Sequence, residues 1–296
     1  MNREKVKIGI IGTGNIGTDL LMKVMSSKVL ECGIFVGRNL NSEGMIKAKQ
    51  LNVPITDKSI DYIIENPDCC SIVFDATSAS THLKNAPILK KLGKFTIDLT
   101  PSKYGTFCIP VINIDNVLDY DNVNMVTCGG QATIPIAKII SKNNPDTKYI
   151  EVVSTIASKS AGIGTRDNID EFTQTTKKAL TYFTGIKNTK AIITLNPAEP
   201  PITMHSTVYA LIENPKIEQI TKDLKILESK MKKYVPGFEI LNEPIYENGR
   251  LTIPLKVTGS GDFLPKYAGN LDIITCAAIE IAEKYVIKKL GGNYYE

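Results

Sequence analysis

The sequence predicts an α/β protein with two domains: a doubly wound parallel sheet, followed by an α+β domain. In the N-terminal half, short apolar strands alternate with helical repeats. After about residue 140 the strands become longer and richer in β-branched residues, and the helices are fewer. The chain has 296 residues, which is long for a single hydrophobic core.

The first predicted strand, residues 5–11, runs into a glycine-rich turn and then a helical repeat. This is the G-x-G-x-x-G pattern in the setting of a Rossmann dinucleotide-binding domain. The first glycine allows the tight turn, the second lets the backbone approach a pyrophosphate, and the third lets the helix pack on the sheet. The residues predicted to bind the cofactor here are Gly12, Thr13, Gly14, Asn15, Ile16 and Gly17.

The second predicted strand, residues 29–36, is followed by Gly37-Arg38-Asn39. An acidic residue would normally hold the adenosine ribose at this point, and it is missing here. An arginine can instead pair with a 2′-phosphate, so Arg38 is a predicted cofactor contact that favours use of NADP. Alternatively, Arg38 stacks on adenine or lies in solvent. The doubly wound pattern continues through helices at 44–51, 59–65 and 82–92 and strands at 71–75 and 95–99.

The second half predicts strands at 148–157, 191–195, 202–211 and 251–257, with helices from about 168 and 215. We expect their sheet to serve also as a subunit interface in a homodimer. A long amphipathic helix at 271–290 is expected to return to the first domain. The predicted domains are residues 1–127 with 268–296, for dinucleotide binding, and 128–267, for catalysis and dimerisation.

Cys128 is the predicted nucleophile, because it lies between a short strand, 123–127, and the segment Gly129-Gly130 that leads into a helix. We expect Pro135 in the first turn of that helix, where proline is tolerated. A helix N-terminus favours a thiolate over a thiol, and the glycines leave backbone N–H groups free to hold an oxyanion. The alternative is a cysteine that only packs in the core.

A polar loop before the next helix is interpreted either as a flexible connection or as a second wall of the cofactor cleft. In the second interpretation the Asn168 amide stabilises a developing oxyanion. The loop residues are Ser160, Ala161, Gly162, Ile163, Gly164, Thr165, Arg166, Asp167 and Asn168. Further along, Asn270 is expected to be a helix N-cap, with cofactor contact as an additional role.

Composition excludes several classes of protein. Net charge is +4 with lysines scattered among acids, so no nucleic-acid surface is expected. No apolar run approaches the roughly 18 residues of a membrane span, and the start of the chain does not look like a cleavable signal. We therefore expect a cytoplasmic protein. The six cysteines show no C-x-x-C pairing, so reduced thiols and no metal site are expected.

Seven runs resemble the acylating acetaldehyde dehydrogenases, bacterial enzymes of aromatic hydrocarbon catabolism that interconvert acetaldehyde and acetyl-CoA. The runs are IGTGNIGTDL, IVFDATSAS, IDLTPS, NVNMVTCGGQATIP, ASKSAGIGTRDNIDEFT, LNPAEPP and YAGNLDI, spread from residue 11 to 273. The resemblance implies a central domain like that of glyceraldehyde-3-phosphate dehydrogenase and a reversible, NAD-dependent reaction with coenzyme A through a Cys128 thioester. It also implies that residues 13–16, 160–168 and 270 contact NAD, and that a 4-hydroxy-2-oxovalerate aldolase is a partner.

The chain departs from the family pattern where an acidic residue would follow LNPAEPP, because it has Met204-His205-Ser206-Thr207 there. His205 is therefore a candidate general base, since histidine titrates near neutral pH. The alternative is a histidine that packs or faces solvent.

Two other functions remain open. A phosphorylating or semialdehyde dehydrogenase of the same fold needs fixed cations for a phosphate or carboxylate, and the second domain has few arginines. A nicotinamide-binding regulator without turnover, if it bound DNA, would need an added helix-turn-helix module, and none precedes Gly12.

Overall fold

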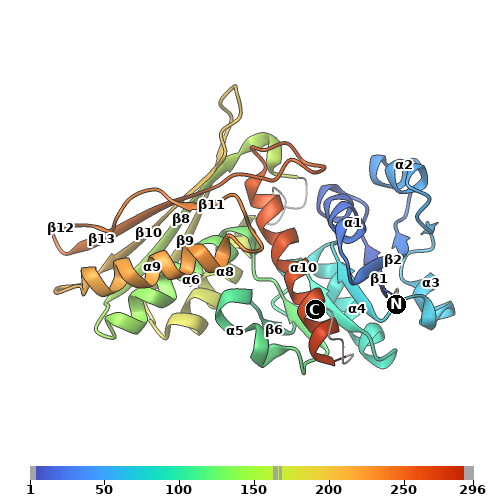
Figure 1. The fold of residues 1–296 in the computed structure, drawn as a ribbon, viewed down its shortest axis with the longest axis horizontal. Coiled ribbons are helices and arrows are strands. Elements are labelled where there is room, and N and C mark those ends of the chain that lie inside the picture. Colours follow the sequence, from blue (N-terminus) through green and yellow to red (C-terminus); the bar gives the residue numbers. More distant parts are fainter. Residues whose placement is uncertain (1–4, 163–165, 167–168, 290–296) are drawn as a thin grey trace. The chain divides into compact units, whose positions relative to one another are not determined.

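The structure, a computed structural model, describes residues 5–162, 166 and 169–289 (Figure 1). The chain divides into two compact units, residues 1–125 with 275–296 and residues 126–274. The proposed boundaries, at 127/128 and 267/268, differ from these divisions by two and seven residues. The second division falls within the last helix, α10 (Gly269–Lys289), where helical periodicity continues without a break.

The first unit is built on a seven-stranded parallel sheet of order β3-β2-β1-β4-β5-β7-β6. The strand order reverses between β1 and β4, and ligands of doubly wound sheets bind beyond the carboxyl ends of strands at such a point. The strands are β1 (Val6–Ile11), β2 (Leu30–Val36), β3 (Ile55–Thr56), β4 (Ile72–Asp75), β5 (Phe95–Asp98), β6 (Thr106–Phe107) and β7 (Asn122–Asn124).

Helices cover both faces of this sheet. Ile63 of α3 and Leu89 of α4 pack with Ile11, Val36 and Val73 on one face. The helices are α1 (Asn15–Ser26), α2 (Glu43–Gln50), α3 (Asp61–Glu65), η1 (Pro67–Cys69), α4 (Ala79–Lys91) and α5 (Pro110–Val117).

The C-terminal helix belongs to this first unit from residue 275 onward. Thr275 donates a hydrogen bond to Asp19 of α1, and the Tyr285 ring stacks on Phe95 of β5 at 3.9 Å. From residue 275 onward, α10 therefore packs against α1 and β5 of the first unit.

The second unit contains a six-stranded sheet of order β11-β13-β10-β8-β9, with β12 paired to β13. All pairs are antiparallel except β8 with β9. The elements are α6 (Cys128–Asn143), β8 (Tyr149–Ala157), η2 (Ser158–Ser160), α8 (Ile169–Thr184), β9 (Thr189–Asn196), β10 (Met204–Leu211), α9 (Ile217–Met231), β11 (Phe238–Ile240), β12 (Ile245–Glu247) and β13 (Arg250–Val257).

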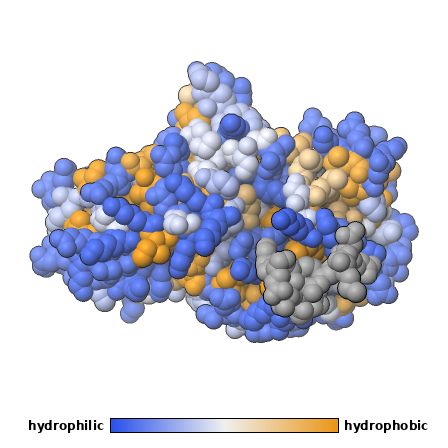
Figure 2. Space-filling model, in the orientation of Figure 1, coloured by the Kyte–Doolittle hydropathy of each residue, from blue (hydrophilic) through white to orange (hydrophobic). Residues whose placement is uncertain are grey.

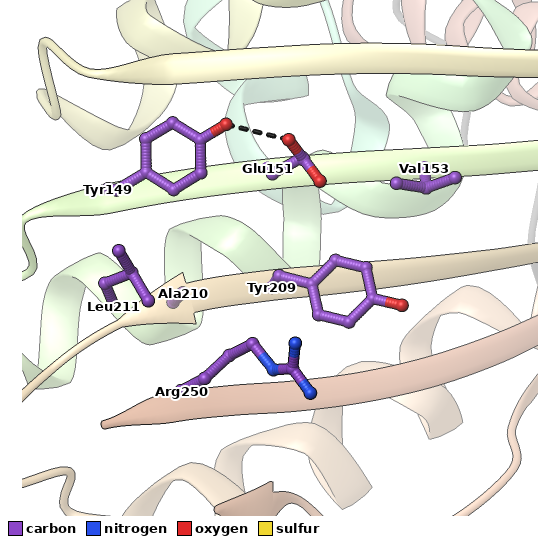
Figure 3. A pocket seen from close by; sticks show the side chains of 7 residues that line it. All are labelled: Tyr149, Glu151, Val153, Tyr209, Ala210, Leu211 and Arg250. Atoms are coloured by element: carbon purple, nitrogen blue, oxygen red, sulfur yellow. Dashed lines mark hydrogen bonds between the residues drawn. The ribbon is translucent and has the colours of Figure 1, made fainter. Parts of the chain in front are cut away.

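The alternation of buried and partly exposed residues along β8, β10 and β13 gives this sheet two different faces. Helices α6, α8 and α9 lie along the buried face (Figure 1). The other face carries a shallow hollow of about 340 Å³, where Tyr149 donates to Glu151 and the Arg250 guanidinium lies over the Tyr209 ring (Figure 3).

Two local predictions were wrong or incomplete. Helix α6 begins at Cys128, so Pro135 lies inside the helix and not in its first turn. The short strands β3, β6, β11 and β12 were not predicted, because runs of two or three strand residues carry no measurable period. The helix α5, which is kinked at Asn113, was not predicted either.

The surface view shows hydrophobic residues scattered among hydrophilic ones on the face drawn (Figure 2). Within the described part of the chain, no helix combines the length and apolar character that a membrane crossing needs.

Candidate active site

Cys128 is the first residue of α6, directly after a turn that leaves β7. The N-cap is Thr127, whose hydroxyl accepts the N–H of Gly130 at 3.0 Å and lies 2.7 Å from the Thr176 hydroxyl of α8. Capping by Thr127 defines where the helix starts, and therefore places the Cys128 sulfur at its positive end.

The turn before Cys128 is strained. Val126 has a φ of +63°, in the left-handed region that a β-branched residue very rarely adopts. Such backbone strain clusters at functional sites and costs on the order of 1–3 kcal/mol. The conformation joins the strand to a helix that begins at Cys128, the predicted nucleophile, and the surrounding packing must hold it in place.

Burial dominates the acidity of Cys128, whose side chain is only 9% exposed. It raises the pKa of the thiol to about 12, against the opposing effect of the N–H groups of Gly129 and Cys128. The expectation of a thiolate favoured by the helix terminus is therefore wrong for the ligand-free protein. The helix dipole can be inferred from the local sequence, but the desolvation of the Cys128 thiol cannot.

Two serines lie beneath the glycines that follow Cys128. A Cβ atom on Gly129 would lie 3.0 Å from Ser154 Oγ and 3.3 Å from the Phe172 ring. Ser206 Oγ donates to Ser154 Oγ at 2.9 Å, and both serines are buried. The sequence analysis did not single them out, because only the pairing of β8 with β10 brings them together.

His205 does not share this location. It lies between Met204 and Ser206 in β10, both of which are buried on the side of α6, whereas the His205 side chain is exposed. Because side chains alternate along a strand, His205 points to the opposite face, where Nδ1 lies 3.0 Å from the Thr203 carbonyl. The structure therefore does not support His205 as the base that serves Cys128.

The predicted dinucleotide turn has a shape that requires glycine at two positions. Gly12 has a φ of +108°, and a Cβ there would lie 2.5 Å from the Ala76 carbonyl oxygen. A Cβ on Gly17 would lie 1.8 Å from the Gly12 carbonyl oxygen. By contrast, the space beside Gly14 is open, and no side chain caps the N-terminus of α1. The backbone N–H groups of Asn15 and Ile16 are thus available for an anion.

The end of β2 is packed tightly against the same turn. Thr13 Oγ1 lies 3.1 Å from the hydroxyl of Ser42, which caps α2. Arg38 is exposed, and within the described residues its guanidinium has no hydrogen-bonding or ionic partner. It is therefore free to meet a ligand or solvent.

The predicted second wall of the cofactor cleft is only partly described. Ser160 is buried and donates to the Ala157 carbonyl, and Arg166 donates to Ala161 and twice to Ser158. No described residue lies within 4 Å of the position that a Cβ on Gly162 would take. The other predicted residues of this loop lie outside the described residues: Ile163, Gly164, Thr165, Asp167 and Asn168.

Asn270 is the second residue of α10 and not its N-cap, because the helix begins at Gly269. Its side chain is 2% exposed, and its amide oxygen has no hydrogen-bond partner among the described residues. A buried, unsatisfied amide oxygen is a feature that a ligand donor can complete.

Sequence reasoning also missed a buried polar cluster in the first unit, around Asp75, His82 and Asp98. The signal was present, because Asp75 and Asp98 each end an apolar strand. His82 was hidden by its place in an apolar helical repeat. Among the described residues, no group of three or more His, Cys, Asp or Glu side chains is arranged to hold a metal ion.

Comparisons with known proteins agree with this architecture. Residues 128–265 match the family described as prokaryotic acetaldehyde dehydrogenase, dimerisation. The chain is 52% identical over 282 residues to the acetaldehyde dehydrogenase of Pectobacterium atrosepticum, and this alignment covers 95% of each chain. It is 49% identical over 292 residues to the acetaldehyde dehydrogenase of Geobacillus stearothermophilus, and this alignment covers 98% of this chain and 99% of the other.

Among solved structures, aspartate semialdehyde dehydrogenase II from Vibrio cholerae aligns with a TM-score of 0.62 at 14% identity. The alignment covers 97% of this chain and 99% of the other. This likeness shows a shared fold and confirms the predicted fold class, a Rossmann domain with a glyceraldehyde-3-phosphate-dehydrogenase-like α+β domain. Since nearly the whole chain aligns at about half identity with curated acetaldehyde dehydrogenases, the protein belongs to the acetaldehyde dehydrogenase family.

Proposed function

We propose that this protein converts acetaldehyde, coenzyme A and NAD⁺ to acetyl-CoA and NADH, reversibly, through a thioester on Cys128. Family membership makes the chain an oxidoreductase with a nicotinamide cofactor. The observation that carries the proposal is the position of Cys128, a buried thiol at the N-terminus of α6 with the Gly129 N–H beside it.

In this mechanism the Cys128 sulfur bonds to the aldehyde carbon, and the carbonyl oxygen becomes an oxyanion. The helix N-terminus stabilises that negative charge as it develops. When bound, the nicotinamide supplies the acceptor for the hydride that leaves the same carbon. The thiol of coenzyme A then attacks the thioester carbon and releases Cys128.

The thiol proton must leave as the C–S bond forms, because Cys128 is protonated at neutral pH. Among the described residues, no charged side chain contributes to its pKa. We assign the proton to water or to a group that enters with the substrates. Asn168 remains proposed as an oxyanion donor.

The described residues fit a dinucleotide. The open space at Gly14 and the uncapped start of α1 suit a pyrophosphate. Asn270 is also a proposed cofactor contact, because the family resemblance implies it. NAD is the proposed cofactor. The unpaired Arg38 supports acceptance of NADP as well, since a guanidinium binds a phosphate strongly.

We propose a homodimer that uses the face of the second sheet opposite α6. This face carries partly buried Tyr149, Val153 and Tyr209, and the matching family model is that of a dimerisation domain. A cytoplasmic location remains a proposal. A 4-hydroxy-2-oxovalerate aldolase partner is a further proposal, which rests on the family resemblance.

The semialdehyde alternative receives no support from the arginines of the second unit. The Arg166 guanidinium is held by Ser158 and Ala161, and Arg250 lies over Tyr209 on the face away from α6. No fixed cation is therefore available beside Cys128 among the described residues.

The test is an NADH-formation assay with acetaldehyde in which the acyl acceptor is varied. We expect turnover with coenzyme A and none with inorganic phosphate. Turnover with phosphate alone would replace the proposed reaction with a phosphorylating one.

A further inference from the structure

A row of buried polar residues crosses the first sheet where its central strands end. Asp75 of β4 pairs in register with Asp98 of β5, and Asp98 pairs with Asn124 of β7. Register partners in a parallel sheet share a face, so these three side chains lie side by side. On β1 the corresponding position is the apolar Ile11. Two carboxylates that are fully buried must be compensated within the protein.

His82, in the first turns of α4, provides that compensation. Its Nδ1 lies 2.9 Å from Asp75 Oδ2 and its Nε2 lies 3.4 Å from Asp98 Oδ2, with no exposure to solvent. The other groups around it are the amides of Asn85 and Asn122 and the edge of the Tyr104 ring. Among the described residues, the charged groups that act on the imidazole are the two carboxylates.

Each carboxylate also holds a loop at the carboxyl edge of the sheet. Asp75 Oδ1 accepts the N–H and the hydroxyl of Thr77, which shapes the loop after β4. Asp98 accepts the N–H of Thr100 and the hydroxyl of Ser102, which shapes the loop after β5. The bridge through His82 therefore connects two loops that are far apart in sequence.

The loop after β4 is in direct contact with the dinucleotide turn. The Ala76 carbonyl lies so close to Gly12 that it leaves no room for a Cβ there. The backbone of residue 77 is the next nearest group to Gly12. A shift of this loop would therefore displace the turn that receives the pyrophosphate.

We propose that His82 is a positioning residue of the cofactor site, which bridges Asp75 and Asp98 and holds the two loops in the form that binds NAD(H). The inference rests on the proposed function, because it concerns the same cofactor. His82 touches neither substrate nor the glycine-rich turn itself, and acts through Asp75 and the loop that follows it.

The bridge depends on the charge of the imidazole. Burial lowers the pKa of His82, but the hydrogen bond to Asp75 and the charges of Asp98 and Asp75 outweigh burial and hold this pKa above its usual value. Burial raises the pKa of Asp98 to about 6, so Asp98 is ionised in the range where His82 loses its proton. As pH rises through the His82 pKa, the cation between the carboxylates is lost.

Asn122 is placed to respond to this change. Its Nδ2 lies 3.0 Å from His82 Nε2, which suits a neutral imidazole that accepts. Its Oδ1 is buried and has no hydrogen-bond partner in the part of the chain that the structure describes. Turning this amide over would give a protonated Nε2–H an acceptor and satisfy the oxygen at the same time. The imidazolium state is the one in which this oxygen gains a partner.

The experiment measures NADH affinity by NADH fluorescence between pH 6.5 and 9. For the wild type, we expect the dissociation constant to rise about fivefold or more across this range, a typical size for coupling between two sites. His82→Asn, whose amide replaces Nδ1 but does not reach Asp98, should bind NADH weakly throughout and lose the pH step. His205→Asn is the matched control, since the chain has only two histidines, and it should keep the step.

A second measurement does not depend on whether a His82 variant folds. By thermodynamic reciprocity, saturating NADH must raise the His82 pKa in the wild type if the protonated form binds more tightly, by about 0.7 units for a fivefold effect. Carbon-13 histidine NMR reports this pKa, with the two signals assigned through His205→Asn.

Two results would overturn the proposal. One is a pH step in NADH affinity that persists in His82→Asn, and the other is a His82 pKa that saturating NADH leaves unchanged. A wild-type protein that does not bind NADH at any pH would overturn the proposed function together with this inference.

Discussion

Cys128 and His82 are both buried ionisable side chains close to the end of a strand, yet their surroundings act on them in opposite ways. Cys128 has only backbone N–H groups to favour its charged form, and burial prevails. His82 has two carboxylates, and their attraction prevails over burial. The surroundings of Cys128 therefore keep its thiol neutral, whereas those of His82 keep a charge inside the protein.

The acidity of Cys128 does not mark it as the nucleophile. Burial raises the pKa of Cys32 to about 12 as well, and raises that of Cys108 further. What distinguishes Cys128 is its place at a helix N-terminus after a strained turn, with glycines on its C-terminal side. Local backbone geometry, and not thiol acidity, therefore supports the choice of Cys128 as the proposed nucleophile.

The largest expected effect is the loss of catalysis in Cys128→Ala, which should leave cofactor binding almost unchanged. Cys128→Ala should lower kcat for acetaldehyde by at least about a thousandfold, because the covalent step needs sulfur. NADH affinity should stay within about twofold of wild type, since the dinucleotide turn belongs to the other unit. Steady-state kinetics and NADH titration measure the two quantities. Cys32→Ala is the control and should keep full activity. A Cys128→Ala enzyme that still forms acetyl-CoA would rule out the thioester.

The pH dependence of Cys128 alkylation tests whether this thiol is neutral, in contrast to the charged His82. With a Cys128 pKa of about 12, the thiolate fraction rises by a factor of about 100 between pH 7 and 9. The rate of iodoacetamide labelling at the Cys128 peptide in ligand-free protein, followed by mass spectrometry, should rise to the same extent. A labelling rate that levels off below pH 8 would show that the helix terminus lowers the pKa after all.

A smaller effect is expected from the replacement of Arg38, a proposed cofactor contact. A charge-assisted hydrogen bond to a 2′-phosphate contributes about 1.5–3 kcal/mol, so Arg38→Ala should lower kcat/KM for NADP⁺ by at least about tenfold. The value for NAD⁺ should change little. Kinetics with both cofactors, in wild type and variant, make the measurement. An equal loss for both, or no loss, would mean that Arg38 does not contact the phosphate.

The smallest effect tests the packing under Cys128. Gly129→Ala would bring its new Cβ to 3.0 Å from Ser154 Oγ, and overpacking of this kind should lower the free energy of unfolding by about 1 kcal/mol. Gly162→Ala, where the space is open, is the control and should change it by less than about 0.5 kcal/mol. Chemical denaturation measures both. If the two variants are equally stable, the contact with Ser154 is not tight.

Much of the fold could be predicted from periodicity and turn residues. The G-x-G-x-x-G turn, the alternating strands and helices of the first half and the return of the C-terminal helix all match the structure. The short strands β3 and β6 could not be predicted, because two residues define no period and their partners supply the pairing. Pro135 was placed wrongly because the helix start depends on the Thr127 cap and not on the proline.

The nucleophile candidate, the dinucleotide turn and the family could each be inferred from the sequence, because residues that are neighbours in the chain carry them. Three features emerged only from the folded structure: the face that His205 occupies, the contact of Ser154 with Ser206, and the place of His82 between Asp75 and Asp98. Those outcomes depend on strand register and helix packing, which join residues distant in sequence. The folded structure is also needed to infer that the Cys128 thiol is protonated, because the desolvation that raises its pKa depends on the whole surrounding volume. The helix dipole, by contrast, can be inferred from a few residues.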